Sequence, residues 1–356
     1  MRKTSKTIIA LFAIASLAAC NKDITPEGGI PTGEGQITFS LDFPEAIQTK
    51  AVSAYTTAQT YETQVNSVQV LVFDAAGKID KYVDAGTAVS GISVSTVTGA
   101  KTVWAVVNGP SLSSIGSVTE LQSKALTLDA NSTTASKGFV MAGSNTCTVG
   151  TTAVTCAITV SRFVSRVALV SVTNKLPESY GSLTVDCAYL TNVVGNQNIA
   201  GSAAAATWYN KFGRADESTQ VESHIIDGST YKASCPDMTY RSIAGNAANG
   251  ASLTPATPYL MYGYPNSSTV APKAFSTAFT AQRTVLVVKA TISGKASYYP
   301  VVLDDAVLAR NTSYTVALTV TGPGSEDPNE PVVKGSMTAS ITVSPWAAGA
   351  VYDETI

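Results

Sequence analysis

The sequence predicts an all-β protein built from β-sandwiches. Short apolar runs recur in which large side chains alternate with polar ones, the period of a strand with one buried face. Gly, Pro, Asn and Asp separate these runs at short intervals, a combination typical of sandwiches. Charged residues make up 13% of the chain, well below the roughly 25% of ordinary soluble domains. This composition favours an exported or surface protein.

The length indicates more than one domain. At roughly 150 residues per domain, 356 residues correspond to two compact units. The sequence Ser161-Arg162-Phe163 interrupts two apolar runs, so we place the boundary there. An N-terminal sandwich is expected at 36–160 and a C-terminal sandwich at 161–356.

The first strand is predicted at 37–43. Ile37, Phe39, Leu41 and Phe43 share one face, and Pro44 ends the run. Later strands are expected at 68–73, 78–83, 102–107, 154–160, 167–172, 182–190, 284–292, 297–303, 314–320 and 336–343, and short helices at 111–121 and 203–212. The last strand alternates as cleanly as the first, with Met337, Ala339, Ile341 and Val343 on one face.

The first twenty residues predict a targeting segment. Basic residues precede an apolar stretch at 8–19, which is too short for a permanent membrane span but suits a secretory signal. It ends in Leu17-Ala18-Ala19-Cys20, which resembles a bacterial lipobox and would make Cys20 the site of lipidation. The alternative is an ordinary signal cut near Ala19. Residues 21–35 are rich in Gly and Pro and are expected to be a flexible tether.

Charge and histidine content exclude several classes of function. A net charge of −2 offers no basic field for a nucleic acid. The single histidine, His224, has no second His or placed nucleophile near it in sequence, so we predict neither an enzyme nor a cofactor. Glu326, Asp327 and Glu330 could hold calcium, but the prolines among them favour a solvated linker, and no metal site is predicted.

Four cysteines remain after Cys20. Three pairings are possible among Cys147, Cys156, Cys187 and Cys235. Cys147 and Cys156 flank a Gly-Thr-Thr turn and could bridge one hairpin, which would leave Cys187 and Cys235 as the second pair. The alternative is that all four are buried thiols.

Several of these patterns occur in the order found in one family. The lipobox is followed by a strand ending at Pro44, by Gln48-Thr49-Lys50-Ala51-Val52, and by the strand 68–74 with a turn at Gly77. Near the other end, Arg310-Asn311-Thr312-Ser313-Tyr314 opens a strand, and 322–328 is rich in Gly and Pro. From residue 1 to about 346 the chain resembles the Bacteroidetes fimbrillins of the FimA and Mfa group, the lipoprotein-precursor pilins of type V pili.

The resemblance implies a fold and a route of export, proteolytic processing and assembly. Fimbrillins have two transthyretin-like β-sandwich domains and are exported as lipoproteins to the outer membrane. A trypsin-like protease removes an N-terminal segment, and the subunits then polymerise by strand exchange. The family's cut usually follows arginine, whereas the matching position here is Lys50, so Lys50-Ala51 is the expected scissile bond.

Strand exchange requires a groove and a donor. Loss of the strand 37–43 would open an apolar groove that a strand of the same period could fill. The segment 336–346 has that period and follows the linker 322–331, so we expect it to be the donor. Two alternatives stay open: this segment is simply the last strand of its own domain, or the tail 347–356 is the donor.

The predicted function is therefore structural. We expect an exported subunit of a surface fimbria whose partners are copies of itself or related pilins, with adhesion to a host protein or glycan as the outcome. The alternative is a monomeric surface lipoprotein that binds glycans through Tyr259, Tyr262 and Tyr264, which could form a stacking surface.

Overall fold

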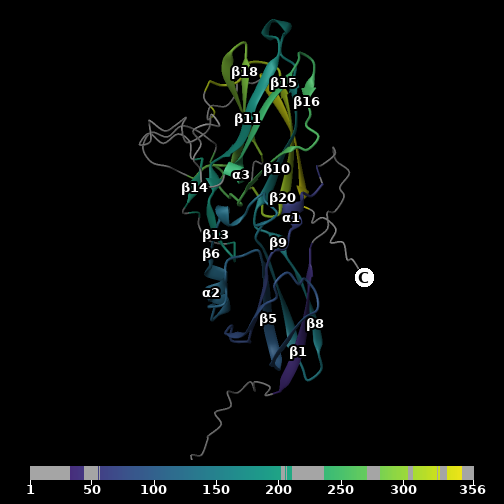
Figure 1. Cartoon of the computed structure of the whole chain (residues 1–356). Coiled ribbons are helices and arrows are strands. Elements are labelled where there is room, and N and C mark those ends of the chain that lie inside the picture. Colours follow the sequence, from purple (N-terminus) through teal and green to yellow (C-terminus); the bar gives the residue numbers. More distant parts are fainter. Residues whose placement is uncertain are drawn as a thin grey trace, which may run out of the picture.

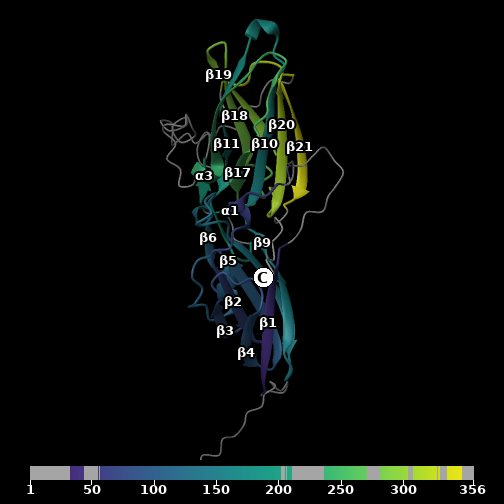
Figure 2. The same cartoon turned by 45° about the vertical axis from the view of Figure 1, so that its right-hand side comes forward.

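The computed structural model describes residues 33–43, 55, 57–201, 205, 207–210, 236–270, 281–303, 308–326, 328 and 335–346. Over these residues the chain is predominantly β, which confirms the predicted fold class. The strands form two β-sandwiches stacked end to end in an elongated molecule (Figures 1 and 2).

The first sandwich pairs two sheets with the strand orders β4-β1-β8 and β3-β2-β5-β7-β9. Their strands are β1 (Glu34–Asp42), β2 (Val68–Phe73), β3 (Ile79–Asp84), β4 (Ile92–Val97), β5 (Gly99–Val107), β7 (Met141–Val149), β8 (Val154–Thr159) and β9 (Ser161–Arg162). Every residue of β2 is buried, whereas β4 alternates between buried and exposed, so β2 is covered on both faces and β4 on one.

The second sandwich pairs β15-β11-β18-β19 with β16-β10-β20-β21, and β17 also pairs with β10. Their strands are β10 (Ser165–Asn174), β11 (Leu183–Thr191), β15 (Tyr240–Ala247), β16 (Ser252–Leu253), β17 (Tyr259–Gly263), β18 (Val285–Ile292), β19 (Lys295–Val302), β20 (Thr312–Val320) and β21 (Met337–Pro345). The chain thus leaves the first sandwich at β9 and enters the second at β10.

The remaining elements of the described chain are short. They are α1 (Thr60–Thr63), α2 (Val118–Ser123), α3 (Pro236–Thr239), η1 (Leu128–Ala130), η2 (Glu178–Tyr180), and the strand pairs β6 (Ala125–Thr127) with β13 (Asn196–Asn198) and β12 (Val193–Val194) with β14 (Trp208–Tyr209). None of the helices in the described ranges is long and apolar enough to span a membrane.

The two predicted helices need correction. The first begins only at Val118, because Ser117 caps it by accepting a hydrogen bond from the Glu120 amide. In the second region, the described residues include Trp208 and Tyr209 as a strand, because their backbone pairs with β12. Tertiary pairing overrides local helix preference there.

The hydrophobic core runs through both sandwiches. A large cluster extends from Leu71 and Phe73 in the first sandwich, through Phe139 and Phe163 at the junction, to Trp346. A second cluster lies inside the first sandwich and includes the inward side chains of β1. The junction is therefore a packed interface, and side chains of both β1 and β21 pack against these clusters.

Candidate assembly site

The N-terminal strand β1 lies in the middle of a sheet. It runs antiparallel to β4 and parallel to β8, so both of its edges are hydrogen-bonded. Ile37 and Phe39 are fully buried, and Leu41 is 7% exposed. Phe43 follows the end of the strand and is partly buried against the same cluster. Figure 2 shows β1 running along the lower sandwich beside β4.

These side chains fill the interior of the first sandwich. They pack among apolar residues of both sheets, including Val70, Val94, Val103 and Ile158. At roughly 1.5–3 kcal/mol for each buried side chain, Ile37, Phe39 and Leu41 together stabilise the sandwich by about 4.5–9 kcal/mol. Without β1, an apolar slot with two unpaired strand edges would remain between β4 and β8. We call this slot the β1 groove.

The backbone of β1 closely approaches the turn between β7 and β8 at one end. A β-carbon at Gly35 would overlap the carbonyl oxygen of Gly150 and come within 2.5 Å of Val149 Cγ1. Backbone atoms cannot move aside as a flexible side chain can. Only glycine therefore fits at this position of the groove.

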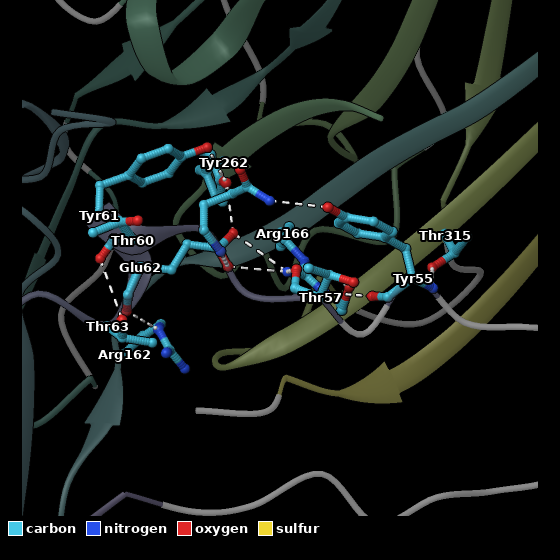
Figure 3. A network of polar contacts seen from close by, with 12 residues as sticks. Tyr55, Thr57, Thr60, Tyr61, Glu62, Thr63, Arg162, Arg166, Tyr262 and Thr315 are labelled. Carbon is cyan, nitrogen blue, oxygen red and sulfur yellow. Dashed lines mark hydrogen bonds and ion pairs between the residues drawn. The ribbon is translucent and has the colours of Figure 1, made fainter. Parts of the chain in front are cut away.

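The predicted scissile bond, Lys50-Ala51, lies outside the described residues. The chain just beyond it is fixed at the junction of the sandwiches. The Tyr55 amide donates to Thr315 Oγ1 over 3.0 Å, and Arg166 donates to the carbonyl oxygens of Tyr55 and Thr57. Figure 3 shows these contacts around Arg166, near the start of β10.

A buried ion pair forms the centre of this anchorage. Glu62 and Arg166 have side chains that are 0% and 1% exposed, and Arg166 Nη1 lies 3.1 Å from Glu62 Oε2. Tyr262 donates to the other carboxylate oxygen over 2.6 Å, and Arg162 Nε donates to the Glu62 carbonyl over 2.8 Å. We call Glu62, Arg162, Arg166 and Tyr262 the junction clamp (Figure 3).

Burial shifts the pKa values of two clamp residues, Tyr262 and Arg162, away from their usual values. Burial raises the pKa of Tyr262 well above its usual value, and the neighbouring carboxylate of Glu62 adds to this. Burial lowers the pKa of Arg162 to about 10, although Glu62 opposes the change. Tyr262 is therefore neutral and Arg162 is charged at neutral pH, which suits a structural site.

The C-terminal strand β21 lies at the edge of its sheet. It pairs antiparallel with β20, and among the described residues no strand pairs with its outer edge. Met337 and Ile341 are only partly buried, Ala339 is exposed, and Val343 is 47% exposed. Figure 2 shows β20 and β21 side by side at the margin of the upper sandwich.

Trp346 anchors the end of β21 in the junction. It is 1% exposed and stacks on Tyr262 at 5.6 Å between ring centroids. The guanidinium carbons of Arg162 and Arg166 lie 4.6 and 5.2 Å from its ring. The chain that follows β1 and the chain that ends β21 therefore meet in the same buried cluster.

Arg310, part of the motif before β20, also joins the sandwiches. Its Nε donates to the carbonyl oxygen of Arg162, and its Nη2 to those of Ala142 and Ser161. Its guanidinium lies 3.8 Å from the centre of the Phe163 ring. The residue thus caps carbonyl groups of the first sandwich from the second.

The cysteines differ from the expected disulfide framework. Cys147 and Cys156 lie on the consecutive strands β7 and β8, which belong to different sheets, and contact each other, but both are free thiols. Burial raises the pKa of Cys156 to about 12, which keeps it protonated and poorly reactive. Cys187 is buried in β11, and Cys235 lies outside the described residues, so the second pairing stays a prediction.

The proposed stacking surface of tyrosines does not exist in this fold. Tyr262 and Tyr264 are fully buried, and Tyr259 is partly buried. Tyr262 contributes to the junction clamp, and Tyr264 donates to the Thr127 carbonyl. Tyr259 and Tyr262 belong to β17, and Tyr264 follows its end, so these residues pack in and around a buried strand and offer no open aromatic face.

The remaining predicted positions are only partly visible. Cys20, His224, Asp327 and Glu330 lie outside the described residues, whereas Glu326 is described. Within the described ranges, no group of three His, Cys, Asp or Glu side chains is arranged to hold a metal ion.

The junction clamp could hardly be predicted from the sequence. Glu62 and Arg166 are 104 positions apart, and charged residues are normally expected at the surface. One usable signal was the charge of Arg162 and Arg166 within an otherwise apolar stretch. A buried arginine needs a buried carboxylate, but the sequence did not identify which one.

Comparison with known proteins points to one family. Residues 36–207 match the family model described as major fimbrial subunit protein (FimA). No curated protein matches the sequence. The matched range begins within β1, includes the rest of the first sandwich and ends in the second.

Solved structures share the fold over most of the chain. A candidate cell adhesion protein from Parabacteroides distasonis aligns with a TM-score of 0.61 at 14% identity, covering 90% of this chain and 99% of that one. Another candidate cell adhesion protein, from Bacteroides eggerthii, aligns with a TM-score of 0.58 at 19% identity. The alignment covers 89% of this chain and 97% of that one. A fimbrilin from Porphyromonas gingivalis aligns with a TM-score of 0.59 at 13% identity. The alignment covers 89% of this chain and 98% of that one.

At these identities the structures establish the fold, and the family model adds the sequence relationship. Together they support a structural subunit of a cell-surface fimbria. The resemblance to the Bacteroidetes fimbrillins is therefore confirmed: this chain matches the fimbrial subunit family over residues 36–207 and has the fold of a solved fimbrilin along most of its length.

Proposed function

We propose that the chain is a pilin that is exported as a lipoprotein and polymerises by strand exchange after proteolysis. The observation that carries this proposal is the position of β1. It is a central strand with buried apolar side chains, and it precedes the predicted scissile bond. A strand in this position fills an apolar groove, and its removal creates a binding site for another strand.

Membrane attachment is the first step of the proposed sequence. Cys20 would carry the acyl chains, and several chains together provide stable anchoring at the outer membrane. Cleavage after Lys50 separates the rest of the subunit from this anchor and from β1. No catalytic residue is proposed, because the function is assembly.

The junction clamp explains how the subunit could survive this cut. The Tyr55 backbone is held by Arg166 and Thr315, four residues beyond Ala51. The new N-terminus would therefore stay attached to the second sandwich. Cleavage would release β1 without loosening α1 or the junction core.

The strand β21 of another subunit is the proposed donor. It already has an extended backbone, and its inward positions are less buried than those of β1. Within Met337–Pro345 its release exposes less apolar surface than release of a central strand would, although the adjoining Trp346 has to leave its buried site at the junction. The Gly- and Pro-rich residues at 322–331 precede it and could act as its hinge.

N-terminal sequencing of filaments sheared from the cell surface tests the proposal. We expect a mature form that begins at Ala51 and a ladder of heat-sensitive oligomers. Lys50→Gln should leave the precursor folded and monomeric, whereas Lys78→Gln, a change in a surface turn, should be processed normally. Mature filaments that retain Cys20 with its acyl chains would contradict the proposal.

The alternative of a monomeric glycan-binding lipoprotein has lost its specific support. The tyrosines that suggested it belong largely to the core. Binding of the finished fimbria to a host protein or glycan is compatible with the proposed function, and it would use a surface other than Tyr262 and Tyr264.

A further inference from the structure

We propose that β21 of a second copy of this chain enters the β1 groove in one defined register, with each residue replacing the residue numbered 300 lower. Gly335 then takes the place of Gly35, and Ile341 that of Leu41. This inference rests on the proposed strand exchange and adds the register, the direction and the fit of the donor.

The two strands share a sequence pattern. β1 and its flanks read Gly-Gln-Ile-Thr-Phe-Ser-Leu-Asp-Phe from Gly35, and β21 reads Gly-Ser-Met-Thr-Ala-Ser-Ile-Thr-Val from Gly335. Glycine, threonine and serine recur at equivalent positions, and three of the four inward residues are large and apolar in both segments. The same face of each segment can therefore point into the groove.

The glycine selects among the possible registers. A shift by one residue turns the apolar face outward. A shift by two residues, in either direction, puts Met337 or Val333 at the position of Gly35. Their β-carbons would then overlap the Gly150 carbonyl oxygen. For a strand spanning the whole groove, only Gly335 avoids this clash.

Gly335 also has a role in the unexchanged chain. Its φ is 96°, a conformation that favours glycine at the turn before β21, and the space around it is open. A substitution there would strain both states, so it cannot test the register. The test must use positions further along the strand.

One position of the donor fits the groove poorly. Ala339 would stand where the fully buried ring of Phe39 lies, and it would leave a cavity beneath β4 and β8. The subunit's own β1 therefore fills the groove better than β21 does. This difference would keep uncleaved precursors from polymerising early and make assembly depend on removal of β1.

A native thiol provides a direct probe of the register. Cys156 on β8 is the pairing partner of Phe39. We would prepare Met337→Cys, Ala339→Cys and Ile341→Cys separately in a Cys147→Ser background, cleave after Lys50, allow polymerisation and add a short thiol cross-linker. The proposed register predicts an intermolecular ladder several-fold stronger for Ala339→Cys, which Cys156→Ser abolishes.

Other outcomes separate the two proposals. A strongest ladder at position 337 or 341 overturns the register but leaves strand exchange by β21 intact. Polymers that form but cross-link at none of the three positions overturn β21 as the donor. Failure of the cleaved wild-type protein to polymerise overturns the proposed function itself.

A second pair of variants tests the direction. In the proposed arrangement, Ile341 lies opposite Ile158, the partner of Leu41. A reversed strand would put Ile341 opposite Val154, the partner of Ile37. With Cys147 and Cys156 both replaced by Ser, Ile341→Cys should cross-link to Ile158→Cys and not to Val154→Cys. The opposite result would show a reversed strand and contradict the proposal.

Filling the cavity tests the poor fit at Ala339. Ala339→Phe should raise the temperature at which polymers dissociate in detergent, and uncleaved precursor should begin to polymerise. Ser340→Phe, on the opposite face of the same exposed strand, is the matched control and should change neither property. No gain from Ala339→Phe over this control would contradict the proposed placement of Ala339.

Discussion

The strands β1 and β21 have similar sequence patterns, but β1 lies in the middle of its sheet and β21 lies at the edge of its sheet. β1 is bonded on both edges and buries its apolar face completely, whereas β21 is bonded to β20 alone and leaves Val343 half exposed. The difference shows that alternation determines which face of a strand can be buried, while the neighbouring strands determine whether it is. An edge strand such as β21 is therefore suited to replace a central strand such as β1.

The largest expected effect concerns polymerisation. Ile341→Asp would bring a charge into the apolar groove, where burial without a partner costs several kcal/mol, so we expect polymers to be lost. The side chain is only partly buried in β21, so the monomer should still fold. Thr338→Asp, on the outward face, is the control. Unchanged polymer ladders with Ile341→Asp would show that β21 is not the donor.

Truncation in the uncleaved protein compares the two strands directly. Phe39→Ala should reduce the free energy of unfolding of the first sandwich by about 3–5 kcal/mol, because it empties a buried site. Ile341→Ala should cost roughly 1 kcal/mol, because its site is half open. Denaturant titration measures both changes. Similar losses would mean that β21 is as firmly held as β1.

The junction clamp should matter in both the precursor and the mature form. Glu62→Ala leaves Arg166 buried without its carboxylate, so we expect a loss of about 3 kcal/mol in unfolding free energy. Unlike the effect of Phe39→Ala, this loss should persist after cleavage, because the clamp lies downstream of Lys50. The double variant Glu62→Leu with Arg166→Met should be less harmful than the sum of the single changes. Full additivity would argue against a coupled pair.

The smallest expected effect is a change in the rate at which the Cys156 thiol is alkylated. Cys156 is buried beside Phe39, and its pKa is raised to about 12, so almost no thiolate is present at pH 8. Removal of β1 should hydrate this thiol, lower its pKa and speed its alkylation. Refilling of the groove in polymers should slow the reaction again.

The alkylation rates would be measured in a Cys147→Ser background on precursor, cleaved monomer and polymer. Equal rates in all three forms would indicate that the β1 groove never opens. Cys187, buried in the second sandwich, serves as the internal reference and should react at a constant rate.

The sequence predicted local features better than distant contacts. The period of Ile37, Phe39 and Leu41 correctly indicated a strand with one buried face. No local pattern indicated that Glu62 would meet Arg166, because burial of a charge depends on partners supplied by the fold. Tyr259, Tyr262 and Tyr264 illustrate the same limit, since their proximity in the sequence could not distinguish an open aromatic face from packing in the core.

A cryo-electron microscopy structure of the filament would identify the strand between β4 and β8, and so would show whether strand exchange occurs. We predict residues 335–343 of a neighbouring subunit there, with Ile341 against Ile158 and no density for residues 33–43 of the same chain. A filament in which β4 and β8 still enclose each subunit's own Ile37 and Phe39 would contradict the account.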